Sequence, residues 1–219
     1  MQTRLDHLVV AASTLEQGVS YIRETLGVDI PEGGEHPLMG THNHVMRIGE
    51  NIFIEVIAVN PVAPPPSRPR WYGLDDPTIQ LSLAKRPRLV TWAANTNDLE
   101  QLQANTPIAI GEITPVSRGD LSWLFAVPED GRLLAGGFVP NVLQWKTDGH
   151  PAANMADLHC RLSKLTIHHP YADWLQSIFN AMQLSDQVVV ESISNDAQAY
   201  MSAEFETPNG VVVLDTRPA

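Results

Sequence analysis

Cysteine is nearly absent from this sequence: Cys160 is the only one among 219 residues. No disulfide can therefore form within the chain, and a reducing compartment fits this composition. Long apolar runs are missing too, since none approaches the roughly 18 residues of a membrane-spanning helix. The first residues, MQTRLDHLVV, lack a signal-peptide pattern, and we therefore expect a cytoplasmic protein without membrane association.

Positive charge and the common nucleotide and hydrolase motifs are also scarce. The chain has 14 Lys and Arg against 25 Asp and Glu, a net charge of −11, which argues against nucleic acid as the main partner. No GxSxG, P-loop or dinucleotide-binding glycine pattern occurs, so serine hydrolases, nucleotide hydrolases and Rossmann enzymes lack support. The hydrophobic share of 43% is ordinary for a soluble globular protein.

The first 60 residues predict a strand, a helix and about three further strands. Leu5–Val10 is apolar and β-branched, as expected of a buried strand. Ser13 and Glu16 have the spacing of a helix capping box, an apolar helical face follows, and Gly27 suits a left-handed helix end. We expect the later strands near Val28–Ile30, at Thr41–Ile48 and at Ile52–Val59.

The rest of the chain repeats this order, so we expect an α+β protein built from βαβββ modules. The tract Pro61–Pro69, PVAPPPSRP, cannot be helical and forms an extended connector. Asn97 and Glu100 repeat the capping-box spacing, and a wide apolar helical face follows Pro170. We predict a first module at residues 1–60, a connector at 61–75, a second module at 76–150 and a third at 151–219.

Two polar residues, His7 and Glu55, lie inside apolar strands. Alternation places His7 with Leu5 and Val9, and Glu55 with Phe53, so both polar side chains point toward packed apolar surface. A buried carboxylate without a partner costs several kcal/mol, so a metal, a cation or a proton is expected beside Glu55.

Structural roles stay open for both residues. His7 can be a core histidine that is hydrogen-bonded to a carbonyl group, and Glu55 can pair with a buried cation such as Arg47. The two side chains can also pair with each other across the sheet without any metal.

The segment GGEHPLMGTHN and the strand that follows it carry four polar side chains of interest: His36, His42, Asn43 and His44. Gly33 and Gly34 allow tight backbone in this loop. We interpret the four side chains as pocket residues that recognise a polar group of a small-molecule ligand, with the two histidines that share a strand face reaching one ligand. The alternative is that they brace the loop through hydrogen bonds to the backbone.

The motifs LDHLVVA, GGEHPLMGTHN and FIEVIAVNP, with FVPNVLQWKTDGHP further on, resemble the glyoxalase-like domain family of the vicinal oxygen chelate superfamily. The resemblance covers roughly residues 1–150, and the remainder as a further module of the same topology. It implies a half-open barrel of strands around a divalent metal, held by residues on the first and last strands of each module. It does not specify one reaction, because the superfamily includes isomerases, lyases, dioxygenases, epimerases and drug-binding proteins.

Carried over by position, the resemblance offers His7 and Glu55 of the first module as metal ligands. Trp92 and Gln144 stand at the corresponding places of the second module. An indole cannot ligate a metal, whereas the carboxamide oxygen of Gln144 can. The resemblance therefore implies at most a three-ligand site for zinc, manganese, iron or nickel, and a site without metal is an equally good expectation.

Three functions fit these observations. The first is an enzyme acting on a small oxygenated molecule, a lyase, isomerase or dioxygenase, with Glu55 as ligand or general base and His42 as proton shuttle. The second is a metal-free binding protein in which Trp71, Trp92 and Trp145 stack on a flat ligand. The third is an interaction module, with the third unit covering an edge of the barrel. The oligomeric state stays open.

Overall fold

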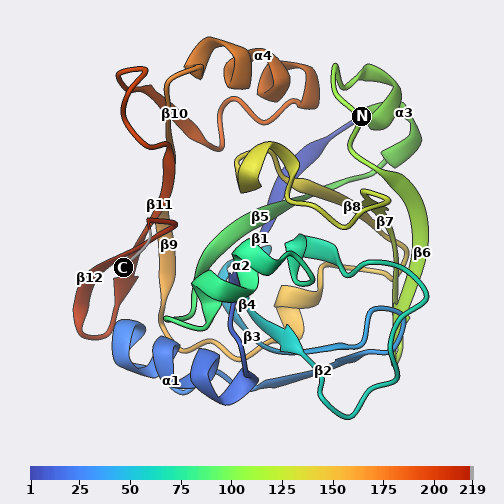
Figure 1. Ribbon diagram of the computed structural model, residues 1–219, viewed down its shortest axis with the longest axis vertical. Coiled ribbons are helices and arrows are strands. Elements are labelled where there is room, and N and C mark those ends of the chain that lie inside the picture. The colour runs from blue at the N-terminus through green and yellow to red at the C-terminus, as the bar shows by residue number, and fades with distance from the viewer. Residues whose placement is uncertain (218–219) are drawn as a thin grey trace.

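Two β-sheets of different size form the frame of the molecule in the computed structural model, which describes residues 1–217 (Figure 1). The larger sheet has the strand order β2-β3-β4-β1-β5-β8-β7-β6 and the smaller sheet the order β10-β9-β11-β12. The strands of the larger sheet are β1 (Thr3–Ala11), β2 (Glu32–His36), β3 (Thr41–Gly49), β4 (Ile52–Val59), β5 (Arg88–Thr96), β6 (Glu112–Arg118), β7 (Leu121–Val127) and β8 (Asn141–Trp145). Those of the smaller sheet are β9 (Arg161–His169), β10 (Val189–Ser192), β11 (Tyr200–Thr207) and β12 (Gly210–Asp215).

Helices join these strands in a recurring order. A strand, a helix and three strands follow one another as β1-α1-β2-β3-β4, as β5-α3-β6-β7-β8 and as β9-α4-β10-β11-β12. The helices are α1 (Leu15–Leu26), α2 (Pro77–Leu83), α3 (Leu99–Asn105) and α4 (Ala172–Met182), with short 3-10 turns η1 (Trp71–Gly73), η2 (Leu134–Gly137) and η3 (Pro151–Asn154). The expected α+β fold of βαβββ modules in a half-open barrel is thus confirmed. Among residues 1–217, none of the helices combines the length and apolar character needed to cross a bilayer.

The larger sheet is arranged symmetrically about its two central strands. β1 and β5 pair antiparallel with each other, and each runs parallel to the last strand of its own unit, β4 or β8. The sheet curls so far that its outermost strands, β2 and β6, come into contact (Figure 1). The concave face of this curled sheet is therefore bordered by strands of both units.

Helix ends lie close to where the sequence places them, with two errors of one residue. Helix α1 ends at Gly27, whose φ of 73° is left-handed as predicted. Its N-cap is Thr14 rather than Ser13, and the N-cap of α3 is Asp98 rather than Asn97. Adjacent residues with equally good capping side chains leave this choice open in the sequence. The second strand was also misplaced, because β2 begins at Glu32 and not near Val28–Ile30.

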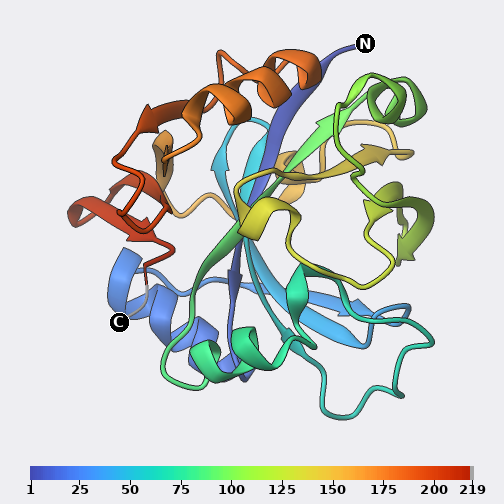
Figure 2. The same cartoon turned by 45° about the horizontal axis from the view of Figure 1, so that its top comes forward.

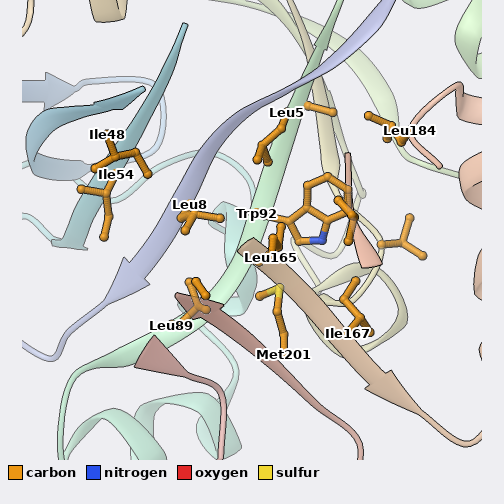
Figure 3. Packing of buried hydrophobic residues seen from close by; sticks show 14 of the residues in the cluster. Leu5, Leu8, Ile48, Ile54, Leu89, Trp92, Leu165, Ile167, Leu184 and Met201 are labelled. Carbon is orange, nitrogen blue, oxygen red and sulfur yellow. The ribbon is translucent and has the colours of Figure 1, made fainter. Parts of the chain in front are cut away.

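The smaller sheet covers the convex face of β1 and β5, as Figure 2 shows from above. Leu8 and Trp92 of the larger sheet pack in one apolar cluster with Leu165, Ile167 and Met201 of the smaller sheet (Figure 3). Because β1 has the cavity side on one face and this cluster on the other, every residue of this strand except Arg4 is buried, the polar Thr3, Asp6 and His7 included.

Replacing Met201 by alanine is expected to lower the free energy of unfolding by about 2–5 kcal/mol, because its fully buried side chain joins the two sheets. Val213 on the exposed face of β12 is 53% exposed and provides the control. Its replacement by alanine should cost about 1 kcal/mol or less. Urea unfolding curves measure both values, and equal losses would show that the second sheet contributes little to the common core.

Candidate functional site

The concave face of the larger sheet contains a cavity lined by six aromatic side chains and a small set of polar ones. The aromatic side chains are Phe53, Trp71, Tyr72, Trp123, Phe125 and Trp145, and the polar ones are His7, His36, Asn43, Glu55 and Arg118. The cavity volume is about 40 Å³ in this conformation. Since one water molecule needs roughly 10–15 Å³ on this measure, the enclosed part suits only a few atoms of a ligand.

A β-bulge places Asp6 beside this cavity. In the pairing of β1 with β5, Leu5 lies opposite Ala94 and His7 opposite Ala93, so that Asp6 is the extra residue. Because of this extra residue, the side chains before the bulge point to the opposite face from the one that simple alternation predicts. His7 and Val9 share the cavity side, as expected. Leu5 was expected on the same side, but it belongs to the core on the convex side.

The Asp6 carboxylate is completely buried and accepts four hydrogen bonds. Its Oδ1 accepts from His7 Nδ1 at 2.6 Å. Its Oδ2 accepts from Asn95 Nδ2 at 2.7 Å, Trp145 Nε1 at 2.8 Å and His150 Nε2 at 3.0 Å. Burial alone raises the pKa of this carboxyl group, but the bonds from His150 and His7 outweigh it and hold the pKa well below the usual range.

These contacts define which nitrogen of each histidine carries hydrogen. His150 Nδ1 accepts from the Ala152 amide at 3.2 Å, so His150 donates to Asp6 through Nε2. His7 donates to Asp6 through Nδ1, which turns Nε2 toward the cavity. There it lies 3.4 Å from the Tyr72 hydroxyl and 3.7 Å from Glu55 Oε2.

Glu55 is held by an amide and not by the cation that the sequence suggested. Asn43 Nδ2 donates to Glu55 Oε1 at 2.6 Å, and Asn43 Oδ1 accepts from Arg118 Nη1 at 2.9 Å. Arg47 instead pairs with Asp157 at 2.8 Å. The carboxylate and the guanidinium therefore lie on either side of one carboxamide, which fixes its orientation.

The paired glycines of the loop make room for this arrangement. A Cβ atom at Gly33 would lie 2.3 Å from Asn43 Oδ1, and one at Gly34 would lie 3.2 Å from Arg118 Cδ. Gly34 also has a φ of 154°, which few other residues adopt. The side chains of Asn43 and Arg118 can therefore lie against β2 only because that strand lacks side chains there.

His36 is a neutral part of the same network. Its Nδ1 contacts Thr41 Oγ1 at 3.0 Å, and Arg118 Nη1 approaches its Nε2 at 3.4 Å. Nε2 is therefore the acceptor and Nδ1 carries the hydrogen. Burial, together with the positive charge of Arg118, lowers the pKa of His36 to about 3. This histidine offers the cavity no charge at neutral pH.

Four of the residues predicted for the site lie outside the cavity. His42 and His44 are on the face of β3 that packs toward α1, where His44 donates to the Ile30 carbonyl at 2.7 Å. Trp92 lies in the convex core and donates to the Phe138 carbonyl at 3.0 Å. Gln144 binds the start of α3 through Leu99 N and Asn97 O, each at 3.1 Å.

A shift of one residue explains two of these errors. Ala93, and not Trp92, lies opposite His7, and the neighbours of Gln144, Leu143 and Trp145, face the cavity. Because strand side chains alternate, an alignment shifted by one position moves every residue to the other face.

Several side chains at the site were not predicted. The role of Asp6 could not be predicted, because the pattern of apolar residues does not show where a β-bulge lies. Tyr72, Trp123 and Arg118 come from the connector and the second unit, and only tertiary folding brings them to the first. Tyr72 has a φ of 59°, a strained value for a residue with a side chain, and its hydroxyl pKa is raised well above the ordinary value by burial beside Glu55.

The side chains present do not fit a firmly held divalent metal. His7 Nε2 and Glu55 Oε2 could both reach one ion, and Asp6 behind His7 resembles the partner that metal-binding histidines commonly have. Zinc sites, however, use three or four protein ligands. The wall opposite is formed by Trp123, Leu143 and Trp145, and within residues 1–217 no three His, Cys, Asp or Glu side chains are grouped to hold an ion.

Comparison with known proteins identifies relatives of the whole fold. The family model described as "Glyoxalase-like domain" matches residues 5–182. A hypothetical protein from Staphylococcus aureus superimposes with a TM-score of 0.56 at 15% identity, covering 98% of this chain and 85% of that one. A mutant 4-hydroxymandelate synthase from Streptomyces coelicolor gives 0.50 at 13% identity, covering 97% of this chain and 62% of that one.

Methylmalonyl-CoA epimerase from Mycobacterium tuberculosis is also similar, with a TM-score of 0.38 at 19% identity over 64% of this chain and 85% of that chain. A search among curated proteins gave no match. At these levels of identity, the first two structural matches establish a shared fold and leave the reaction open.

Stability should fall as the pH falls below about 6.5, because the folded protein holds His36 neutral with a pKa of about 3 while the unfolded chain takes up the proton. Each pH unit in this range costs up to about 1.4 kcal/mol through His36. Urea unfolding at about pH 7 and about pH 5 measures this loss. On acidification, the variant H36N should lose less free energy of unfolding than the wild type. H159N, at an exposed position, should keep the wild-type pH dependence. If the free energy of unfolding of H36N fell with pH as steeply as that of the wild type, a neutral buried His36 would be contradicted.

Metal content gives a direct test of the donor set. After reconstitution with zinc, manganese, iron or nickel and dialysis, elemental mass spectrometry should find far less than one ion per chain, because only His7 and Glu55 are available as ligands. A near-stoichiometric ion that is retained in H159A and lost in H7A would show that the site does hold a metal.

Proposed function

Because the chain belongs to the glyoxalase-like domain family, we propose that it is an enzyme that moves a proton on a small oxygenated molecule held in this cavity. The observation that carries the proposal is the row of Asp6, His7 and Glu55. Two ionisable side chains of this row face the cavity, and the third fixes the orientation of one of them. Such a pair of groups is what a proton transfer between two atoms of one molecule requires.

Glu55 is the base in this proposal. Its Oε1 is occupied by the hydrogen bond from Asn43, while Oε2 is directed toward His7. Oε2 therefore has free lone pairs for a proton from a carbon atom next to a carbonyl or hydroxyl group. A positioned base of this kind accelerates proton transfer roughly 10²–10⁴-fold.

His7 receives or returns the proton at the neighbouring oxygen of the bound molecule. Its Nδ1 hydrogen is fixed on Asp6, so Nε2 can accept a proton while the Asp6 carboxylate stabilises the resulting imidazolium. The Tyr72 hydroxyl lies 3.4 Å from Nε2 and can donate a hydrogen bond to an oxygen that becomes negative. The proposed chemistry thus uses only side chains of this chain.

The aromatic walls support a second candidate function, a binding protein without turnover. Trp71, Trp123 and Trp145 all face the cavity, where their rings can cover both faces of a flat molecule. Under this alternative Glu55 and His7 only form hydrogen bonds to the ligand, and no proton leaves a carbon atom.

Hydrogen exchange in D₂O separates the two functions. We expect the wild-type protein to speed the exchange of carbon-bound hydrogens in at least one of hydroxyacetone, lactaldehyde, pyruvate and lactate, followed by proton NMR. E55Q should lower that rate by roughly 100-fold or more, because the base is lost. E50Q, the same change at an exposed turn residue, should leave it unchanged. Binding of these compounds without any exchange would favour the binding protein.

A further inference from the structure

We propose that Arg118 forms an anion-binding subsite in the cavity, so that the molecule bound there carries a carboxylate group. The inference rests on the proposed function in one respect, since it names the substrate class of that same cavity. It is carried by the position and the partners of Arg118.

Among the described residues, Arg118 is the one arginine that lines the cavity, and no carboxylate pairs with it. Arg68 and Arg88 also bond only to neutral groups, but they lie away from the cavity. Arg47, Arg70 and Arg161 each pair with an aspartate. The recorded partners of Arg118 are neutral instead: the Asn43 side-chain oxygen at 2.9 Å and the neutral nitrogen of His36 at 3.4 Å. Among residues 1–217 it forms no ion pair with a carboxylate, although the chain has a net charge of −11.

The geometry leaves donors of Arg118 free for a ligand. Both recorded contacts use Nη1, and within the described residues Nη2 and Nε have no hydrogen-bond acceptor. The guanidinium is partly buried, and burial lowers the pKa of Arg118 while the negative charge of Glu55 acts in the opposite direction. A planar guanidinium with two free N–H groups matches a carboxylate, whose two oxygens accept both hydrogens at once.

The charges of the cavity also orient such a ligand. Glu55 lies on the other side of the Asn43 amide, and its negative charge repels a carboxylate from that end. The carboxylate is thus directed to Arg118 and the uncharged part of the molecule to Glu55 and His7. Because the enclosed space is about 40 Å³, a short acid fits this description better than a large one.

A purely mechanical role is the competing explanation. Arg118 joins the end of β6 to His36 on β2 and Asn43 on β3, and so it connects the two edges of the curled sheet. A clasp between neutral groups does not require a charge, however, and a neutral amide side chain would avoid the cost of burying a cation.

The test compares pyruvate with pyruvamide, which has nearly the same shape and no charge. Binding is followed by the indole N–H signals of the five tryptophans in ¹⁵N-labelled protein. Trp71, Trp123 and Trp145 face the cavity, while Trp92 and Trp174 lie away from it and serve as internal controls. We expect pyruvate to shift only the three cavity signals and to bind about 10- to 100-fold more tightly than pyruvamide.

Variants of Arg118 distinguish the effect of its charge on binding from its role in connecting the sheet edges. R118M should lose the preference for pyruvate, R118K should keep part of it, and R132M, an exposed arginine paired with Asp130, should keep all of it. Equal binding of both compounds to the wild type, no shift of the cavity signals by either, or an unchanged preference in R118M would overturn the proposal.

The same titration on E55Q distinguishes this inference from the proposed function. E55Q should still bind pyruvate at least as well as the wild type, because a negative charge is removed from the cavity. Tight pyruvate binding without hydrogen exchange would leave the anion subsite standing and refute the proton transfer. Hydrogen exchange only in uncharged compounds, with equal binding of pyruvate and pyruvamide, would support the proton transfer and refute the anion subsite.

Discussion

One buried negative charge organises this cavity. The Asp6 carboxylate is out of contact with solvent and is stable there because four hydrogen-bond donors from β1, β5, β8 and the segment after β8 converge on it. A carboxylate without such partners would cost several kcal/mol in this position. The donors must therefore be in place together, which fixes the ring of His7 and the indole of Trp145, two of the side chains that line the cavity.

A second polar chain runs from Glu55 through Asn43 to Arg118 and His36. It crosses the interior from the centre of the sheet to the place where its edges meet. One end is a carboxylate and the other a guanidinium, separated by an amide that contacts both. The cavity consequently has two ends of opposite charge between aromatic walls, and this polarity distinguishes it from an apolar pocket.

The sequence predicts the frame of this molecule better than its site. Period-two patterns were enough to place His7 and Glu55 on inward strand faces, and helix-ending signals such as Gly27 were equally clear. The role of Asp6 was not predicted, because one extra residue in a strand does not change the pattern of apolar residues. Trp92 and Gln144 were assigned to the wrong face by a shift of one position, and Arg118 reaches the site only through the curl of the sheet, a property of the whole chain.

The segment that joins the two sheets, residues 146–160 between β8 and β9, is held by side-chain contacts near both of its ends. Near its start, His150 bonds to Asp6 under the cavity, and near its end Asp157 pairs with Arg47 of β3 and with Arg161 of β9. Residues that connect two layers of a protein often act as a hinge, but a hinge needs a stretch without such anchors. The two sheets also share one apolar core, so if a protease cut this segment between its anchors, the two fragments should stay associated.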